Sequence, residues 1–409
     1  MRIVMLTWEY PPRVVGGISK VVYELSQKLG ELGDEVHVVT LLEDGSREFE
    51  VDGFVNVHRV HLPSIESFDF IQWVYHLNIA IIEYLISLIN KIGNVDIIHA
   101  HDWLVAYSAV TIKNSYCIPM VSTIHATENG RNNGIYTDLQ RYINSVEWWL
   151  TYQSYKVIVN SYYMKREVER IFSLPNDKVS VINNGICINK FDYSNYDINF
   201  RRKYAMDNEK ILFFVGRLVN EKGVSCLIDA MPRIINEFHD VKLVIVGKGQ
   251  EMECLKNKAC NLGILNKVYF AGYVDENELK MLYKCADIAI YPSFYEPFGI
   301  VALEAMLAGV PTVVSDVGGL GEIILNDEDG KKFYTGCSNS LADSVLDILK
   351  NSDKAEYITK NARAKVLERY SWDILVKQYQ DLYNMVLKKA KETEWKQNVE
   401  KYIEGGEFR

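Results

Sequence analysis

The residues best suited to chemistry stand in the segment Glu296-Pro-Phe-Gly-Ile-Val-Ala-Leu-Glu304, where two carboxylates lie eight positions apart. Pro297 suits the first turn of a helix, which places Glu296 at the end of the preceding strand. The free backbone N–H groups near Gly299 and Ile300 are then expected to bind a phosphate oxygen. Because a carboxylate accepts hydroxyl hydrogen bonds more strongly than a neutral group, we expect Glu296 to bind sugar hydroxyls and Glu304 a diol such as a ribose. By composition alone, however, an exposed helical glutamate is more often a surface residue.

Two cations share one predicted strand-to-helix loop. Val215-Gly-Arg-Leu218 ends a strand and Glu221-Lys-Gly223 opens the next helix, so Arg217 and Lys222 lie close in sequence to a helix start. A guanidinium bridges phosphate oxygens with its planar fork, and an ammonium acts as a point charge. The pair is therefore predicted to bind a diphosphate and to stabilise its charge without a metal. The alternative is two surface cations near a turn.

Two glycine motifs follow predicted strands. Gly16-Gly17 precedes a helix that begins at Ile18, where backbone N–H groups could approach an anion or a sugar. A tight turn with positive φ is the equal alternative. In Gly247-Lys-Gly249 the sixth position is Met252, so the dinucleotide-binding pattern GxGxxG is incomplete and a dehydrogenase is disfavoured.

The elements that must position these residues alternate along both halves of the chain. Strands are predicted at residues 2–7, 36–41, 54–60, 96–99, 119–124, 157–160, 179–182, 211–215, 243–246, 268–270, 288–291 and 312–315, with amphipathic helices between them. Such alternation predicts an α/β fold with parallel sheets covered on both faces. We expect two doubly wound, Rossmann-like domains facing across a cleft, at residues 1–195 and 196–370. A helix at about 371–395 is expected to pack back on the first domain.

Composition excludes several classes of protein. The net charge of -9 opposes non-specific binding to nucleic acid. The seven cysteines are scattered without a CxxC pair, which indicates reduced thiols in a cytoplasm and argues against structural zinc. The longest apolar stretch, residues 71–89, is interrupted by Gln72, His76, Asn78, Glu83 and Ser87, so we expect a core helix rather than a membrane span.

Taken in order, these motifs together with Asn184-Gly185 resemble family 4 of the retaining glycosyltransferases, whose members have the two-domain GT-B fold. The resemblance runs from Arg2 to about Leu387. It implies a metal-independent hexosyltransferase that needs no cofactor, with the acceptor on the first domain and a nucleotide sugar on the second. It implies that Glu296 contacts the donor hexose, that Glu304 binds the ribose, and that Arg217 and Lys222 bind the diphosphate. The nucleotide base is expected to lie against residues 270–274, which include Val274.

Two further segments, His99-Ala-His-Asp-Trp103 and Thr123-Ile-His-Ala-Thr127, resemble those of glycogen and starch synthases. The resemblance implies that His125 contacts a hydroxyl of the transferred sugar, although a lone histidine after a strand is more often structural. Asp102 and His101 either support the acceptor side or merely cap the helix that begins near Trp103. Arg131 and Asn184 are further candidates for acceptor or supporting roles.

The predicted activity is therefore elongation of an α-1,4-glucan or oligosaccharide from UDP- or ADP-glucose. Starch synthases carry a lysine in a Lys-x-Gly-Gly motif where this chain has Val14-Val-Gly-Gly17, so their donor specificity does not carry over. Two alternatives remain open: a family 4 transferase for another sugar or for a small-molecule or lipid-linked acceptor, and a non-catalytic nucleotide-sugar-binding protein. The sequence leaves the oligomeric state open.

Overall fold

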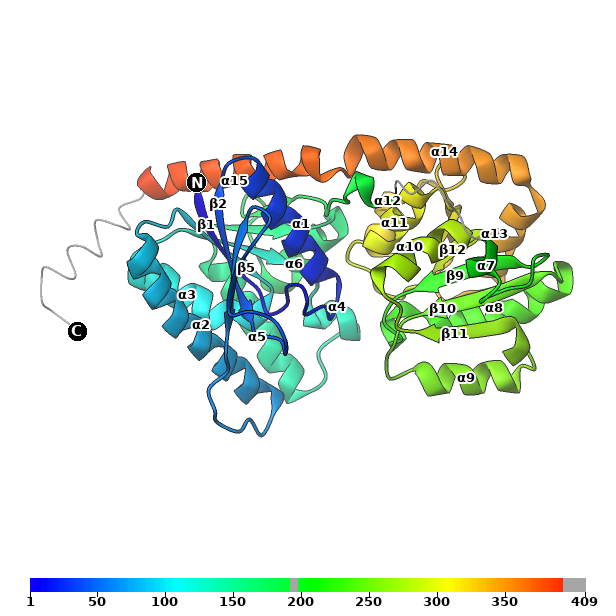
Figure 1. The fold of residues 1–409 in the computed structure, drawn as a ribbon, viewed down its shortest axis with the longest axis horizontal. Coiled ribbons are helices and arrows are strands. Elements are labelled where there is room, and N and C mark those ends of the chain that lie inside the picture. The colour runs from blue at the N-terminus through cyan, green and yellow to red at the C-terminus, as the bar shows by residue number, and fades with distance from the viewer. Residues whose placement is uncertain (192–197, 393–409) are drawn as a thin grey trace, which may run out of the picture. The chain divides into compact units, whose positions relative to one another are not determined.

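The computed structural model describes residues 1–191 and 198–392, and the chain divides into two compact units (Figure 1). Unit 1 comprises Met1–Gly185 and the described chain from Trp372, and unit 2 comprises Ile186–Ser371. The predicted boundary at residues 195–196 lies outside the described residues, and the division falls earlier, after Gly185. Ile186 belongs to unit 2 because it pairs with Ser371 and its N–H donates to the carbonyl of Tyr370 at 2.8 Å.

Within the described residues, the sheet of unit 1 has eight strands in the order β3-β4-β2-β1-β5-β6-β7-β8. All neighbours are parallel except β3 with β4. The strands are β1 (Arg2–Leu6), β2 (Glu35–Leu41), β3 (Phe49–Asp52), β4 (Val55–Val60), β5 (Ile97–His101), β6 (Met120–Ile124), β7 (Lys156–Val159) and β8 (Val179–Val181). The sequence did not predict the edge strand β3, because its Phe-Glu-Val-Asp pattern contains no continuous apolar run. Strand β5 also extends to His101, beyond its predicted end at His99.

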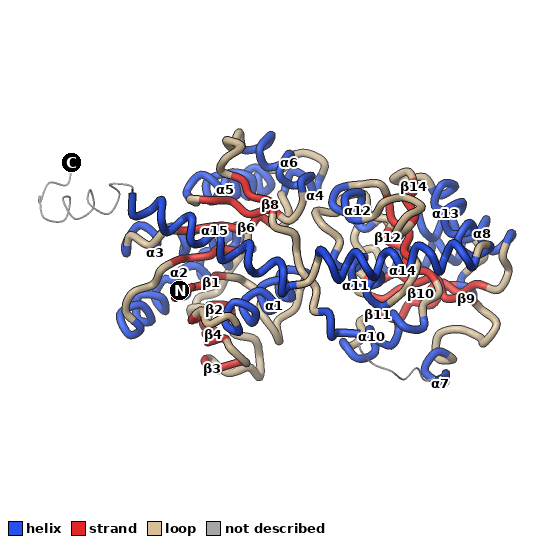
Figure 2. The backbone as a smooth tube through the Cα atoms, turned by 90° about the horizontal axis from the view of Figure 1, so that it is seen from above, coloured by secondary structure: helices blue, strands red, loops and turns tan. Residues whose placement is uncertain are grey.

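Helices cover both faces of this sheet (Figure 2). Helix α1 packs against α15, while α2 packs against α3, which in turn packs against α5. The helices of unit 1 are α1 (Gly17–Glu31), α2 (Phe70–Ile92), α3 (Ala106–Tyr116), α4 (Glu128–Asn132), α5 (Asp138–Gln153), α6 (Tyr162–Phe172) and α15 (Trp372–Glu392), with a 3-10 turn at Trp103–Val105. Helix α15 is the C-terminal helix expected at about 371–395, and its predicted end lies outside the described residues.

Helix α2 is the one helix among the described residues that is long and apolar enough, by length and composition, to cross a membrane. Its neighbours include α3, the 3-10 turn at Trp103–Val105, β4 and β2. Buried residues such as Leu77, Ile81 and Leu85 recur at helical spacing along it. This face packs against the rest of unit 1.

Unit 2 contains a parallel sheet whose six described strands follow the order β11-β10-β9-β12-β13-β14. They are β9 (Lys210–Val215), β10 (Val241–Val246), β11 (Val268–Gly272), β12 (Ile288–Tyr291), β13 (Thr312–Ser315) and β14 (Lys331–Phe333). The helices are α7 (Ile198–Arg201), α8 (Val224–Glu237), α9 (Met252–Asn261), α10 (Glu276–Cys285), α11 (Ile300–Ala308), α12 (Gly318–Ile323), α13 (Ser338–Lys350) and α14 (Ser352–Arg369), with 3-10 turns at Ile188–Phe191, Asn220–Lys222 and Leu265–Lys267. Helix α8 packs on α9 and α13, and α11 packs on α10 and α14. The predicted apolar face of α8 is buried, including Leu227, Ile228 and Met231.

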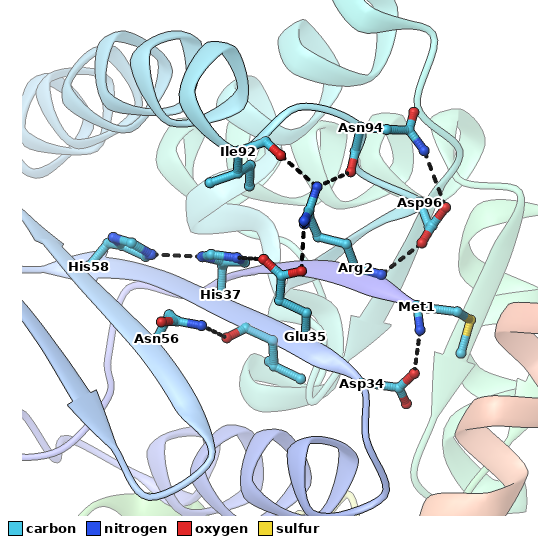
Figure 3. A network of polar contacts seen from close by, with 11 residues as sticks. Met1, Arg2, Asp34, Glu35, His37, Asn56, His58, Ile92, Asn94 and Asp96 are labelled. Carbon is cyan, nitrogen blue, oxygen red and sulfur yellow. Dashed lines mark hydrogen bonds and ion pairs between the residues drawn. The ribbon is translucent and has the colours of Figure 1, made fainter.

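A polar network ties the amino-terminal ends of β1 and β2 together (Figure 3). The Arg2 guanidinium forms an ion pair of 2.7 Å with the Glu35 carboxylate. The His37 Nε2 lies 3.0 Å from Oε1 of the same carboxylate. The chain continues from His37 to His58 at 2.9 Å and from His58 to the Tyr84 hydroxyl at 2.7 Å. The two imidazoles are buried, so unit 1 contains a histidine pair away from its carboxyl-edge loops.

Candidate active site

Three loops at the carboxyl edge of the unit 2 sheet hold one another in place. They follow β9, β12 and β13, which are neighbours in the sheet. The N–H of Phe294, after β12, donates to the carbonyl of Glu221, after β9, at 2.8 Å. The N–H of Gly319, after β13, donates to the carbonyl of Glu296 at 2.9 Å. The loop that carries Glu296 is therefore fixed from both sides.

Gly223 permits the closest of these approaches. Its φ is +64°, and a Cβ added there would lie 1.9 Å from the carbonyl oxygen of Pro292. Only glycine adopts this conformation at no steric cost and leaves the room for such a contact. The Glu221-Lys-Gly223 segment can thus lie directly against the loop after β12.

This packing brings Lys222 to Glu296. The Lys222 Nζ lies 2.8 Å from Glu296 Oε2, and the Ser293 hydroxyl donates to the same oxygen at 3.2 Å. Glu296 is 8% exposed, so its charge is largely withdrawn from water and is balanced by the ammonium. Lys222 has three N–H donors, so two remain for a ligand, and the pairing also orients the carboxylate.

Arg217 lies on the same loop but is half exposed, and its guanidinium pairs with Glu221 at 2.7 Å. The structure therefore places both predicted cations on the loop after β9, each held by a carboxylate. An exposed ion pair of this kind is weak, so Arg217 can exchange Glu221 for a phosphate at little cost.

The helix after Glu296 begins later than predicted. Pro297 was expected in its first turn, but α11 begins at Ile300, and Gly299 precedes it with φ 108° and ψ 53°. This left-handed conformation separates the loop from the helix, so Glu296 and Pro297 both lie in the loop. No side chain caps α11, which leaves the first-turn N–H groups around Gly299 and Ile300 without a side-chain acceptor among the described residues.

Glu304 lies inside unit 2, with 1% of its surface exposed. Its Oε2 accepts a hydrogen bond of 2.9 Å from the hydroxyl of Tyr283, a buried residue of α10. Burial, followed by the charge of Glu304, raises the pKa of the Tyr283 hydroxyl well above its usual range, so this hydroxyl remains a donor. A ribose contact by Glu304 stays a prediction.

Val274 follows β11 and packs partly against the core of unit 2. It comes two residues after Gly272, which has φ +70° and ends the strand. Its predicted contact with the base also stays a prediction.

In unit 1 the structure brings together three predicted residues from neighbouring strands. His101 ends β5, and His125 directly follows β6. The His101 Nδ1 lies 3.1 Å from the His125 Nε2, and the two rings stack with their centroids 5.4 Å apart. The backbone N–H of His125 donates to the Asp102 carboxylate at 2.8 Å. Asp102 makes no capping hydrogen bond to the turn at Trp103, so of its two predicted roles the helix cap is wrong.

Burial keeps this histidine cluster neutral. It lowers the pKa of His101 well below the ordinary value, and it lowers the pKa of neighbouring His99 to about 3. The pKa of His125 is also lowered by burial, against the opposing charge of Asp102. At neutral pH these imidazoles therefore act as neutral donors and acceptors.

Gly16 differs from both predicted uses of the Gly16-Gly17 turn, whereas the ligand contact predicted for Gly17 stays a prediction. Gly16 has φ -151°, which is extended rather than left-handed backbone, so a turn with positive φ is wrong for it. Its N–H donates to the carboxylate of Glu9 at 2.9 Å, and the N–H of Val15 donates to the same oxygen at 2.6 Å. The protein's own carboxylate thus takes the Gly16 N–H that was expected to meet a ligand. Gly17 is the first residue of α1.

Arg131 and Asn184 both belong to unit 1. Arg131 lies in α4. Its charge adds to the burial that lowers the pKa of His125, and it opposes the burial that raises the pKa of Glu147. Asn184 follows β8 and is 3% exposed, and its Oδ1 is buried without a hydrogen-bond partner among the described residues. The Oδ1 of Asn160, after β7, is in the same situation. Buried carbonyl oxygens of this kind can accept from substrate hydroxyls.

Among residues 1–191 and 198–392, no group of three or more histidine, cysteine, aspartate or glutamate side chains could hold a metal ion.

Comparison with known proteins assigns the family. Residues 15–190 match the family model "Glycosyltransferase Family 4", and residues 197–365 match "Glycosyl transferases group 1". An uncharacterized glycosyltransferase of Methanocaldococcus jannaschii is 42% identical over 393 residues, which covers 95% of this chain and 99% of that protein. This chain is a glycosyltransferase. A glycogen synthase of Mycobacterium tuberculosis is 35% identical over 387 residues, covering 91% of this glycosyltransferase and 92% of that protein.

Solved structures show that the glycosyltransferase has the GT-B fold. Sucrose-phosphate synthase from Thermosynechococcus elongatus matches with a TM-score of 0.83 at 23% identity, covering 95% of this chain and 99% of that one. Anabaena HepE in complex with UDP-glucose matches with a TM-score of 0.77 at 20% identity, covering 94% and 100% of the two chains. The predicted α/β fold class of two doubly wound, Rossmann-like domains is confirmed.

Three buried carboxylates or hydroxyls of this glycosyltransferase were missed by sequence reasoning. Glu9 lies in the loop after β1 and Ser293 in the loop after β12, while Glu147 accepts the N–H of Glu128 at 2.9 Å from within α5. Burial raises the pKa of the Glu9 and Glu147 carboxyls above the usual range. Glu9 and Ser293 could have been found from their places after strands, whereas nothing in the helical pattern around Glu147 marks it out.

Proposed function

We propose that this glycosyltransferase transfers glucose from UDP- or ADP-glucose to the end of an α-1,4-glucan, with retention of configuration and without a metal ion. The observation that carries the proposal is the Lys222–Glu296 pair, 2.8 Å apart and held at the carboxyl edge of unit 2. It places a fixed cation beside a fixed hydroxyl acceptor. A nucleotide sugar, which joins a diphosphate to a polyhydroxyl ring, has both of the groups that such a pair binds.

On the donor side, each part of the nucleotide sugar has a proposed partner. The remaining N–H groups of Lys222, the guanidinium of Arg217 and the uncapped start of α11 would neutralise the diphosphate as its charge grows. Glu296 would accept hydrogen bonds from the hexose. Glu304 would bind the ribose, with the Tyr283 hydroxyl holding its carboxylate, and Val274 would line the base.

On the acceptor side, unit 1 offers neutral groups to neutral hydroxyls. His125 can donate to a hydroxyl of the transferred sugar, and the buried carbonyl oxygens of Asn160 and Asn184 can accept from acceptor hydroxyls. In the proposed step the bond between C1 and the phosphate oxygen breaks, and the acceptor oxygen bonds to C1 on the same face. The acceptor proton passes to the departing phosphate, so no side chain of the protein becomes covalently bound.

The choice of glucan rests on the relationship to glycogen synthase at 35% identity. The choice of donor is supported by HepE, whose structure holds UDP-glucose. A second candidate acceptor is an anionic small molecule, because Arg131 lies near His125 and could pair with a phosphate or carboxylate. We also propose that the protein acts in the cytoplasm, in line with its scattered, unbridged cysteines.

The test is release of nucleoside diphosphate from UDP-, ADP- and GDP-glucose, with EDTA throughout. One series contains glycogen or maltooligosaccharide, a second contains small phosphorylated or carboxylated acceptors, and a third contains no acceptor. Release that depends on glucan, with products that an α-glucan hydrolase cleaves, supports the proposal and names the donor. Release only with an anionic small acceptor replaces the glucan, and binding of nucleotide without release in any series indicates a non-catalytic protein.

A further inference from the structure

We infer that His101 is a positioning residue that fixes the tautomer of His125, so that His125 carries its proton on Nδ1 and offers this N–H to a hydroxyl oxygen of the substrate. The tautomer follows from the hydrogen-bond geometry of two buried, neutral rings. Only its use in transfer rests on the proposed function.

The two imidazoles share one hydrogen bond. The His101 Nδ1 and the His125 Nε2 lie 3.1 Å apart, and both side chains are at least nine-tenths buried. Since both rings are neutral, one proton lies between these two nitrogens. Either His101 donates to His125, or His125 donates to His101.

The surroundings of His101 decide between these arrangements. Its other nitrogen, Nε2, is buried and has no hydrogen-bond partner among the described residues. If His125 donated, His101 would have to carry a proton on that nitrogen, as a buried N–H without an acceptor. Buried N–H groups without a partner are rarer in proteins than buried acceptors without one. In the other arrangement the unpaired N–H is that of His125 Nδ1, which is not among the fully buried atoms without a partner. The less costly arrangement therefore keeps the proton on His101 Nδ1, which then donates to His125 Nε2.

The neighbours of the pair do not offer an alternative. His99 lies next to His101 with ring centroids 4.1 Å apart, but its two nitrogens contact the Tyr383 hydroxyl at 2.7 Å and the Thr123 hydroxyl at 2.7 Å. Asp102 holds the backbone N–H of His125 rather than its ring. The imidazole of His101 is therefore the one group in the described part of the chain that is hydrogen-bonded to the ring of His125.

The two ring nitrogens of His125 therefore have different, fixed roles. Its Nε2 lone pair is occupied by His101, and no described residue is hydrogen-bonded to Nδ1. A neutral imidazole in this tautomer can donate one hydrogen bond to a sugar oxygen but cannot accept the proton of the acceptor hydroxyl there. His125 would thus orient the transferred sugar, and the acceptor proton would go elsewhere, as in the proposed step.

The first test needs no substrate. In the full-length protein labelled with ¹⁵N-histidine, long-range ¹H–¹⁵N correlation spectra at pH 7 distinguish the two tautomers and the doubly protonated ring. The His125 signals are assigned by their loss in His125→Asn. We expect a neutral ring with the proton on Nδ1. A proton on Nε2, or on both nitrogens, would overturn the inference.

The second test changes the donor. His101→Phe removes the N–H and should release His125 to protonate Nε2, whereas His101→Gln keeps an N–H donor and should preserve the Nδ1 tautomer. The matched control is His58→Phe, in the other buried histidine pair, which should leave the His125 spectrum unchanged. An unchanged His125 tautomer in folded His101→Phe would contradict the inference. If that variant does not fold, the wild-type and His101→Gln spectra still decide.

Kinetics then test the use of the tautomer. In the glucan-dependent assay, His101→Phe should lower kcat roughly tenfold and leave the KM for glucan unchanged. This is the loss expected for one hydrogen bond to the reacting sugar. His101→Gln should keep most of the wild-type kcat. If the spectra show the Nδ1 tautomer but the protein elongates no glucan, the inference stands and the proposed function is wrong. An unchanged kcat in an active His101→Phe enzyme would show that the tautomer has no catalytic use.

Discussion

The two units carry different kinds of polar groups at their candidate sites. Unit 2 assembles formal charges at its carboxyl edge, with Lys222 and Glu296 in contact and Arg217 paired to Glu221. Unit 1 brings together mainly neutral groups, namely stacked imidazoles and amide oxygens without hydrogen-bond partners among the described residues, with Asp102 and Arg131 beside them. Seven of the eight histidines of the chain stand in unit 1, and His239 alone stands in unit 2. A diphosphate needs cations, whereas sugar hydroxyls need oriented neutral donors and acceptors, so this difference matches the proposed division between donor and acceptor.

The largest expected effect comes from the charged unit. Lys222→Ala should lower kcat by roughly 10³, because it removes both the cation beside the leaving group and the partner that orients Glu296. The measurement is steady-state transfer, with the melting temperature as a check on folding. Lys256→Ala, an exposed lysine of α9 paired with Glu253, is the matched control and should leave kcat within about twofold of wild type. A kcat for Lys222→Ala equal to that of the control would break the comparison.

Acid should weaken unit 1 first. The folded-state pKa of His58 is lowered to about 4 by burial, below its unfolded value of about 6.5. As the pH falls, the unfolded chain binds the proton first, so stability is fully present above pH 6.5 and is lost between about 6.5 and 4, by roughly 3 kcal/mol for this group. Buried His99 adds to the loss in the same direction.

Urea unfolding from pH 7 to pH 4.5 measures this loss. No tryptophan stands between residues 186 and 371, so tryptophan fluorescence follows unit 1. His58→Phe should flatten the pH dependence of the fluorescence transition. A transition that does not move between these pH values would argue against neutral buried histidines.

A glycine substitution tests how the loops of unit 2 are held. Gly223→Ala should destabilise the protein by about 2 kcal/mol or more, because it adds strain at positive φ and a Cβ 1.9 Å from the Pro292 carbonyl. Gly263→Ala is the control, since Gly263 has φ +69° and nothing within 4 Å of the added Cβ, and it should cost about 1 kcal/mol. Chemical denaturation gives both values. Equal losses of stability in the two variants would mean that the contact between Gly223 and the Pro292 carbonyl contributes nothing to stability.

The smallest effect is expected in the neutral unit. His125→Asn should lower kcat about tenfold, since it removes one neutral hydrogen bond rather than a charge. The measurement is glucan-dependent release of nucleoside diphosphate, alongside Lys222→Ala. A loss as large as that of Lys222→Ala would mean that unit 1 contributes more than orientation, and the contrast between the units would need revision.

Periodicity predicted most of the fold, because buried parallel strands read as apolar runs and α8 repeats its apolar face at helical spacing. It missed β3 and β14, whose short sequences are polar at alternate or successive positions. For the site, spacing placed Arg217, Lys222 and Glu296 on loops at one sheet edge. It could not show that Glu9 occupies the Gly16 N–H or that Tyr283 meets Glu304, since those contacts depend on side chains from elements distant in sequence.

The chain leaves and re-enters unit 1 at one place. A Cβ on Gly185 would lie 2.5 Å from the ring of Trp372, and the next residues inward, Ile186 and Ser371, pair with each other. Unit 2 is thus an insert whose two ends meet, so it can be exchanged as a cassette through two junctions while unit 1 keeps its own core. If unit 2 binds the donor and unit 1 the acceptor, as proposed, replacing residues 186–371 with the corresponding segment of a related transferase should change the nucleotide that is used without changing the acceptor.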